Sequence, residues 1–225
     1  MRLAGILLTV LIAPCWLLGQ VNQSEEPKHQ WTISGLFSFD FYPFKNLNSR
    51  KFYETQWQFN HSYGIELLKH YKKNKRLGGS IIYSVKDHDE ELNCVDCDSL
   101  PQTPTKLQHS VRYIEIPITF RKTFFENQGN SLFYLGAIQP AFIHKAESKA
   151  SFKNGESGSL EVNDQQFGRF LLGIKGGIGF KRMIDQQVGV EVMPYFKLYG
   201  TDLFRDGYLN FTSFGVTLKL THDFQ

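Results

Sequence analysis

The sequence predicts an all-β fold, a single antiparallel up-and-down transmembrane β-barrel of about eight strands. Three observations predict it: alternation of apolar and polar residues, regular exchange of short and long connections, and polar faces rich in small and charged residues. The stretch YIEIPITFRKTFF at residues 113–125 shows the alternation, because Ile114, Ile116 and Ile118 share one strand face and Glu115 lies on the other. In a soluble sheet the apolar face would cover a core, whereas in a membrane barrel it would meet lipid.

Length and composition narrow the classes of protein that fit. The 225 residues suffice for one large domain or two small ones, and no segment reads as a linker, so residues 21–225 are expected to form one barrel domain. The net charge of +3 is too close to neutral to indicate a nucleic-acid partner. The mean hydropathy of −0.31 is that of a soluble protein, but a membrane barrel has such a value too because its lumen-facing positions are polar.

The N-terminus predicts export. Residues 1–19 read MRLAGILLTVLIAPCWLLG, a basic start at Arg2 followed by an apolar run and a small residue, which is typical of a signal peptide ending near residue 20. The alternative is a membrane anchor, because the run approaches the length of a spanning helix. Export would leave Cys94 and Cys97, which can pair as a disulfide in an oxidising compartment.

Eight strands are expected, in chain order, over residues 30–42, 52–70, 76–87, 110–125, 131–145, 166–181, 187–199 and 209–224. The connections after the second, fourth and sixth strands are short and polar (YKKNK, ENQGN and MIDQ), as in hairpin turns. The connections after the odd-numbered strands are longer. Short turns at one end and long loops at the other are typical of an outer-membrane barrel.

Most of these strands have two unlike faces. The apolar faces of the first, second, sixth, seventh and eighth strands include, in order, Phe37 and Phe39; Tyr63, Ile65 and Leu67; Phe170, Leu172 and Ile174; Val190 and Val192; Phe214, Leu218 and Leu220. The opposite faces carry polar groups such as Ser38, Asp40, Gln58, Asn60, Tyr195, Lys197 and Thr217. The third strand is expected in RLGGSIIYSVKD at residues 76–87, and the fourth contains the stretch quoted above.

Prolines make the register of three strands harder to predict. Pro140 lies in the middle of the fifth strand, where it removes a ladder donor and suggests a bulge. Pro117 and Pro194 raise the same question in the fourth and seventh strands. His61 also fits poorly, because it falls on the apolar side of the second strand.

The volume of a small barrel decides which face points outward. The interior of an eight-stranded barrel has room only for side chains, so dozens of bulky residues would overfill it unless it enclosed a ligand cavity. The apolar faces are therefore expected to meet lipid. Charged residues of both signs would then lie in the lumen as a paired network that plugs it: Glu66, Glu115, Arg121, Arg169, Lys175, Glu191 and Lys219. The alternative is that these are water-facing residues of a soluble sheet.

The chain resembles the outer-membrane β-barrel domain family of Bacteroidota, which includes PorT-like proteins. The residues that carry the resemblance are YIEIPITFRKTF, LLGIKGGIGF and the closing FGVTLKLTHDF, and it covers residues 30–224. It implies an integral outer-membrane protein in contact with lipid, inserted by the barrel-assembly machinery, with no known shared catalytic residues. Chains of this type often end in an aromatic residue; here Phe224 is penultimate.

No catalytic residue or cofactor is predicted. His61 and Ser62 are adjacent, so on a strand they point to opposite faces and cannot form a nucleophile and base pair.

The segment of residues 87–98 combines carboxylates, a histidine and both CVDC cysteines, which could suit calcium or zinc. No second cysteine or histidine pair completes a zinc site and the spacing does not match an EF-hand, so an exposed acidic loop is favoured and no metal site is assigned.

These observations predict a protein of the cell outer membrane with a structural, adhesive or secretion-accessory role and an extracellular or secretion-system partner that the sequence does not name. The alternative is a soluble periplasmic carrier of an apolar ligand, similar to a lipocalin, in which the two faces of every strand would be reversed.

Overall fold

The computed structural model describes residues 30–42, 53–55, 58–72, 74–92, 104–152, 157–160, 169–200 and 212–224. The predicted signal peptide and the Cys94–Cys97 pair lie outside the described residues. The strands are β1 (Trp31–Tyr42), β2 (Tyr53–Thr55), β3 (Gln58–Lys72), β4 (Lys75–Leu92), β5 (Pro104–Glu115), β6 (Ile118–Asn127), β7 (Asn130–Phe152), β8 (Ser157–Leu160), β9 (Phe170–Met183), β10 (Val188–Tyr199) and β11 (Thr212–Phe224). No helix among these residues is long and apolar enough to cross a membrane.

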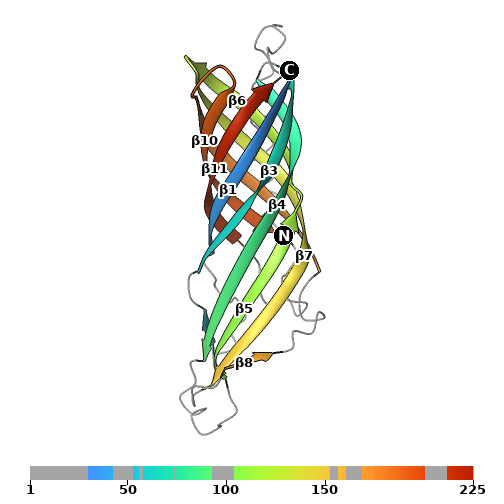
Figure 1. Ribbon diagram of the computed structural model, residues 1–225, viewed down its shortest axis with the longest axis vertical. Coiled ribbons are helices and arrows are strands. Elements are labelled where there is room, and N and C mark those ends of the chain that lie inside the picture. The colour runs from blue at the N-terminus through green and yellow to red at the C-terminus, as the bar shows by residue number, and fades with distance from the viewer. Residues whose placement is uncertain are drawn as a thin grey trace, which may run out of the picture.

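The strands close into one antiparallel ring (Figure 1). Around the ring each strand pairs with the next in the order β1, β3, β4, β5 with β6, β7, β9, β10 and β11, and β11 pairs back onto β1. Counting β5 and β6 as one strand, the ring has eight strands, as the sequence predicted. Closure leaves no unpaired edge within the ring, which is what a sheet in lipid requires.

The strand β5–β6 is interrupted only at residues 116–117. Its pairing with β4 keeps one register across the gap, since Glu115 lies opposite Ile82 and Ile118 opposite Gly79. Pro117 has no N–H to donate, but its carbonyl accepts a hydrogen bond of 3.1 Å from the Ser80 amide. The proline therefore breaks the ladder for two residues without shifting it.

The expected bulge at Pro140 is absent, and this part of the sequence interpretation was wrong. Residues 139–141 pair with residues 171–173 of β9 without a shift, and the Pro140 carbonyl accepts from the Ile116 amide at 2.9 Å. The irregularity in β7 falls instead at His144, which has no partner between the pairs Tyr113–Ile143 and Arg112–Lys145. The missing proline donor is tolerated because the ladder on either side continues.

Short turns join the strands at one end of the ring, as predicted. The turn between β6 and β7 has two residues, Gln128 and Gly129, both with positive φ (45° and 80°). Two consecutive positive φ values are typical of the type I′ turn, which suits the twist of a two-residue hairpin. Residues 184–187 connect β9 to β10 at the same end.

Three strands are longer than the sequence predicted. β4 runs to Leu92, β5 begins at Pro104 and β7 ends at Phe152, whereas these segments were expected to belong to long loops. They continue to pair beyond the ring, and the short strands β2 and β8 extend this sheet on β4 and β7. Figure 1 shows this sheet projecting from the end opposite the short turns. We call it the projecting sheet.

The faces are oriented as the volume argument predicted, with apolar side chains outside. Ile114, Ile116 and Ile118 are 37%, 42% and 59% exposed, whereas Glu115 is fully buried between them. Large apolar side chains exposed on the outer surface include Phe39, Phe59, Ile65, Ile81, Ile178, Val192, Phe214 and Leu220. We call this surface the apolar belt. A water-soluble protein would not expose such a continuous band.

Candidate functional site

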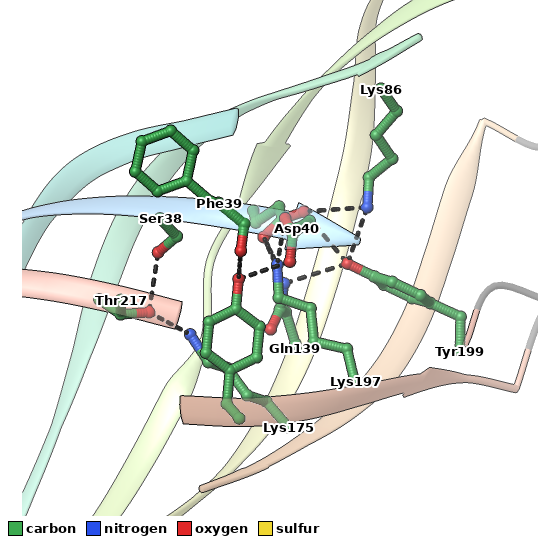
Figure 2. Close-up of polar contacts among 11 residues, drawn as sticks. Ser38, Phe39, Asp40, Lys86, Gln139, Lys175, Lys197, Tyr199 and Thr217 are labelled. Carbon is green, nitrogen blue, oxygen red and sulfur yellow. Dashed lines mark hydrogen bonds and ion pairs between the residues drawn. The ribbon is translucent and has the colours of Figure 1, made fainter. Parts of the chain in front are cut away.

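The interior of the barrel is lined by polar side chains that contact one another. At the end nearest the projecting sheet, Lys197 of β10 lies 3.2 Å from Asp40 of β1 and 3.7 Å from Glu115 of β5. Lys86 of β4 lies 3.4 Å from the other oxygen of Glu115. Figure 2 shows Asp40, Lys86 and Lys197 converging inside the ring from three strands. All are at least 98% buried, so each charge depends on its partners for stability.

Two further side chains complete this cluster. The Tyr199 hydroxyl donates to Glu115 at 3.1 Å and accepts from Lys86 at 3.2 Å and from the Gln139 amide at 3.1 Å. The Gln139 amide also donates to Glu115. Glu115 is thereby the centre of the cluster, with two cations and two neutral donors around one buried carboxylate.

A second layer lies further along the barrel axis. Lys175 of β9 donates to the Thr217 hydroxyl at 3.3 Å, and Thr217 is 2.8 Å from Ser38. The Lys175 ammonium also lies 3.8 Å from the centre of the Tyr195 ring, a cation–π contact. Tyr195 in turn donates to Asp40 at 2.5 Å, which joins this layer to the first.

Two ion pairs cross the middle of the barrel. Lys219 of β11 pairs with Glu66 of β3, and Arg121 of β6 lies 2.5 Å from Glu191 of β10. The Arg121 guanidinium also lies 3.5 Å from the Phe133 ring centre. A cavity of about 10 Å³ is lined by residues that include Glu66, Lys175 and Lys219, which is room for at most one water molecule. The side chains fill this section of the lumen.

A fourth group lies at the short-turn end. Asp223 of β11 accepts from Lys181 at 2.7 Å and from Thr32 at 2.5 Å, with Arg76 at 3.8 Å. His70 is 2.9 Å from the Thr32 hydroxyl. Polar contacts therefore extend from one end of the ring to the other.

Six of the seven predicted lumen charges lie in this interior. Glu66, Glu115, Arg121, Lys175, Glu191 and Lys219 are all buried, and two of the ion pairs join members of the predicted set. Arg169 is not among them. It is exposed and immediately precedes β9, and its carbonyl accepts from the Ile143 amide at 3.1 Å. Since the strand starts only at Phe170, the alternation from which Arg169 was assigned does not reach it.

The structure adds lumen residues that the predicted set lacked: Asp40, Lys86, Gln139, Lys181, Lys197, Tyr195, Tyr199 and Asp223. The signal was present, because Asp40, Tyr195 and Lys197 alternate with apolar residues in the sequence. Alternation could not show which residues meet across the barrel. Lys197 and Glu115, for example, come from strands that are not neighbours, and their contact depends on the closure of the whole ring.

The residues considered for chemistry are separated. His61 is exposed on the apolar belt, stacked near Phe37 with ring centres 6.4 Å apart, while Ser62 faces the lumen and is buried. Among the described residues no cluster of three or more histidines, cysteines or carboxylates could hold a metal ion. Residues 93–98 of the acidic segment, with Cys94 and Cys97, fall outside them.

No protein-family profile matches the chain, and no curated protein matches it. Solved structures with a similar fold include Neisserial surface protein A (TM-score 0.48, 8% identity, 86% of this chain and 97% of that one). They also include OprG of Pseudomonas aeruginosa (TM-score 0.49, 10% identity, 89% and 98%). A third is Ail, the attachment invasion locus protein of Yersinia pestis (TM-score 0.42, 12% identity, 87% and 97%). The fold assignment rests on the pairing of this chain's own strands: it is a closed antiparallel β-barrel with an apolar exterior.

Proposed function

We propose that this chain is an integral outer-membrane β-barrel with a sealed lumen that carries the projecting sheet outside the cell in a structural or adhesive role. The observation that carries the proposal is the reversal of the faces, with charge inside and large apolar side chains outside. Lipid is the solvent in which this arrangement is stable, because the exterior then meets hydrocarbon while every ring strand is paired.

The soluble carrier fits these observations poorly. A lipocalin-like protein would line its interior with apolar side chains around a ligand cavity. Here the interior positions carry Glu115, Lys197 and their partners, and the bulky side chains are outside.

A sealed lumen is supported by the layers of polar contacts. The Glu115 cluster, the Arg121–Glu191 and Lys219–Glu66 pairs and the Asp223 group follow one another along the barrel. An ion crossing the barrel would have to displace each of them, which means exposing buried charges without their partners. A scaffold or adhesin needs no such path, whereas a porin does.

Heat-modifiability tests the membrane barrel. The full-length chain is expressed, outer and inner membranes are separated, and unboiled and boiled samples are compared in SDS. We expect the protein in the outer-membrane fraction with a change in mobility on boiling. Recovery from the soluble periplasmic extract without a mobility change would contradict the proposal.

A matched pair of variants tests the apolar belt. Ile81 is 66% exposed on β4 within the belt, and Asp87 lies on the same face of the same strand at the edge of the belt, next to Phe59. Ile81→Lys should destabilise the folded barrel by about 2–4 kcal/mol if Ile81 lies near the bilayer midplane. Asp87→Lys should leave the heat-dependent mobility change as in the wild type. Equal tolerance of both lysines would contradict a lipid-facing Ile81.

Conductance tests the seal. The purified barrel in a planar bilayer should show no steady channel current, whereas a stable open channel would exclude a sealed lumen.

The adhesive role is tested in cells that lack the gene. Loss of attachment with normal secretion supports the adhesive role. Loss of secretion would favour the secretion-accessory role that the resemblance to PorT-like proteins implies.

A further inference from the structure

The apolar belt contains a groove. Its volume is about 1160 Å³, and it lies over β1, β3 and β4 where Gly35 and Gly79 present no side chain. Ile65, Ile81, Tyr83 and Leu220 line its sides. No atom lies within 4 Å of the position that a Cβ at Gly35 would occupy, so the space above this glycine is open. A depression of this size in a lipid-facing surface can receive acyl chains of one lipid molecule.

A second, polar groove lies on the outer face of the projecting sheet. Its volume is about 600 Å³, and its lining includes the carboxylates Asp87, Asp89 and Glu147, the cations Arg112 and Lys149, and the amide of Gln108. Carboxylate, amide and hydroxyl groups of this kind bind sugar hydroxyls, and the cations bind phosphate.

The bulge at His144 creates this charged surface. Along β7, the odd-numbered residues 133–141 face the lumen, and simple alternation would send Lys145, Glu147 and Lys149 inward as well. The extra residue reverses the phase, so that Ser148 and Ala150 are buried and Lys149 is exposed. Lys145 comes to lie directly opposite Arg112 of β5. Two cations side by side repel each other unless an anion lies between them.

Glu147 balances only part of this charge. It forms an ion pair with Lys145, and this hydrogen bond lowers the pKa of the Glu147 carboxyl below its ordinary value. Both side chains remain about half exposed, at 51% and 41%. Arg112 therefore lies next to the Lys145–Glu147 ion pair, and a phosphate could bind to Arg112 and Lys145 together.

The two grooves lie next to each other on β4 and β5, although no described residue lines both. Tyr83, which lines the apolar groove, pairs with Ile114, and Arg112, which lines the polar groove, pairs with the next outward residue of β4, Val85. A molecule lying across both would meet hydrocarbon side chains on one side and, on the other, the Arg112 and Lys145 cations next to the carboxylates of the polar groove. That is the chemistry of a phosphorylated lipid at a membrane surface.

We infer that this surface binds one phosphorylated glycolipid of the outer leaflet, with acyl chains in the groove over Gly35 and Gly79 and phosphate at Arg112 and Lys145. The inference rests on the proposed function, because it needs the barrel in a membrane with the projecting sheet outside. A glycolipid is favoured over a glycerophospholipid because the polar groove continues past the cations to Gln108, Lys149 and Asp87, with room for sugar rings.

The test uses the folded full-length chain in detergent micelles and native mass spectrometry. The probes are bis-phosphorylated lipid A, the same lipid without phosphates, and phosphatidylglycerol. We expect bound bis-phosphorylated lipid A to survive collisional activation that removes the other two. Removing both phosphates should weaken binding by roughly tenfold or more, because charge-assisted hydrogen bonds are lost. Equal retention of all three lipids would overturn the inference.

Matched variants locate the site. Arg112→Gln with Lys145→Gln removes the phosphate contacts, and Lys69→Gln with Arg182→Gln removes two exposed cations at the short-turn end as the control. Gly35→Leu fills the apolar groove, and its control Gly136→Leu adds the same side chain where a Cβ also meets nothing within 4 Å. Weaker lipid A binding in the first member of each pair supports the site. Binding equal to that of its control overturns it.

Heat-modifiability of the same samples separates the two proposals. If the wild type shows no mobility change, the membrane barrel itself is wrong. If the wild type changes mobility but does not prefer bis-phosphorylated lipid A, only the lipid site is wrong. Should Gly35→Leu fail to fold, Gly35→Ala and the comparison of phosphorylated with dephosphorylated lipid on the wild type still decide the question.

Discussion

Lys175 and Lys219 are two buried lysines of the lumen in different surroundings. Lys219 pairs with the Glu66 carboxylate. Lys175 contacts the Thr217 hydroxyl and the Tyr195 ring, and among the described residues no carboxylate lies within ion-pair distance of it. The Lys219 ammonium is therefore in direct contact with a carboxylate, whereas the direct contacts of the Lys175 ammonium are with a hydroxyl and an aromatic ring, so the two should respond differently to neutralisation.

Lys219→Met should lower the free energy of unfolding by about 3–5 kcal/mol, because it leaves Glu66 buried without its partner. Lys175→Met should change the free energy of unfolding much less or raise it, since among the described residues no carboxylate loses a direct ion-pair partner. Urea unfolding in phospholipid vesicles, followed by tryptophan fluorescence, measures both. Equal destabilisation by the two substitutions would contradict this description of the lumen.

At this scale alternation predicts where a side chain points but not what it meets. Glu115 was assigned to the lumen from its isoleucine neighbours, and the structure places it there. Its partners Lys86, Lys197 and Tyr199 come from β4 and β10, far away in sequence. Their contact depends on ring closure and strand tilt, which no local pattern contains. Arg169 was wrongly assigned to the lumen for another reason. Alternate residues share one face only within a strand, and Arg169 lies just before β9 begins.

Among the elements, the turn between β9 and β10 combines backbone hydrogen bonds to the Val188 carbonyl with the side-chain carboxylate of Asp185. Asp185 accepts from the backbone amides of Gln187 and Val188, both at 2.7 Å. These hydrogen bonds lower the pKa of Asp185 below its ordinary value. Because the folded pKa is the lower one, the contribution to stability is present above the unfolded pKa and is lost as the pH falls through the folded pKa.

In NMR spectra of the folded barrel, the amide signals of Gln187 and Val188 should therefore shift together as Asp185 titrates. In the variant Asp185→Asn this shared titration should disappear, while the rest of the spectrum is retained. Titration of these amides in the variant as in the wild type would mean that another group controls the turn.

The pairing of β3 with β4 depends on a close approach at Gly64. A Cβ there would lie 2.2 Å from the Ile81 carbonyl oxygen and 2.8 Å from the Ile82 Cα, so backbone would have to move. Gly64→Ala should destabilise the barrel by about 1–3 kcal/mol, as overpacking does in other tightly packed sites. Gly136→Ala, where the added atom meets nothing within 4 Å, is the matched control. If the urea midpoint falls equally in both variants, the close approach at Gly64 is not the cause of the destabilisation.

The strands of the ring could be predicted because an apolar face in lipid leaves a period of two in the sequence. The outer parts of β4, β5 and β7 could not, because neither face carries a row of large apolar side chains. Residues 146–150 alternate small Ala and Ser with charged residues, and residues 104–110 contain one large aliphatic residue, Leu107. Pairing between the strands orders them instead.

The bulge was expected at Pro140, where a donor is missing. The extra residue of β7 lies instead at His144, which has no sequence feature of its own.

For the whole molecule, ring closure brings the two ends of the described chain together. The Gln30 amide donates to the Phe224 carbonyl at 3.0 Å, and β1 pairs with β11 over its length up to Phe41. Covalent continuity between β3 and β4 is therefore not essential to the ring, provided the strands keep their neighbours.

A circular permutant that joins residue 224 to residue 30 by a short Gly-Ser linker and opens the chain at Asn74 should still fold. We expect it to show the heat-dependent mobility change of the wild type. A control opened between residues 137 and 138, inside β7, should not, because it divides a central strand. Failure of the first permutant beside a folded wild type would contradict the closed ring.

The unpaired His144 also has a genetic consequence. A three-nucleotide deletion that removes this codon preserves the reading frame and every other residue. Because His144 is the extra residue of the bulge, its loss would make the pairs Tyr113–Ile143 and Arg112–Lys145 consecutive and leave Lys145, Glu147 and Lys149 facing outward. A substitution at the same codon leaves the extra residue in place. A gene for this barrel can therefore lose the bulge in one mutational event and still keep its charged outer surface.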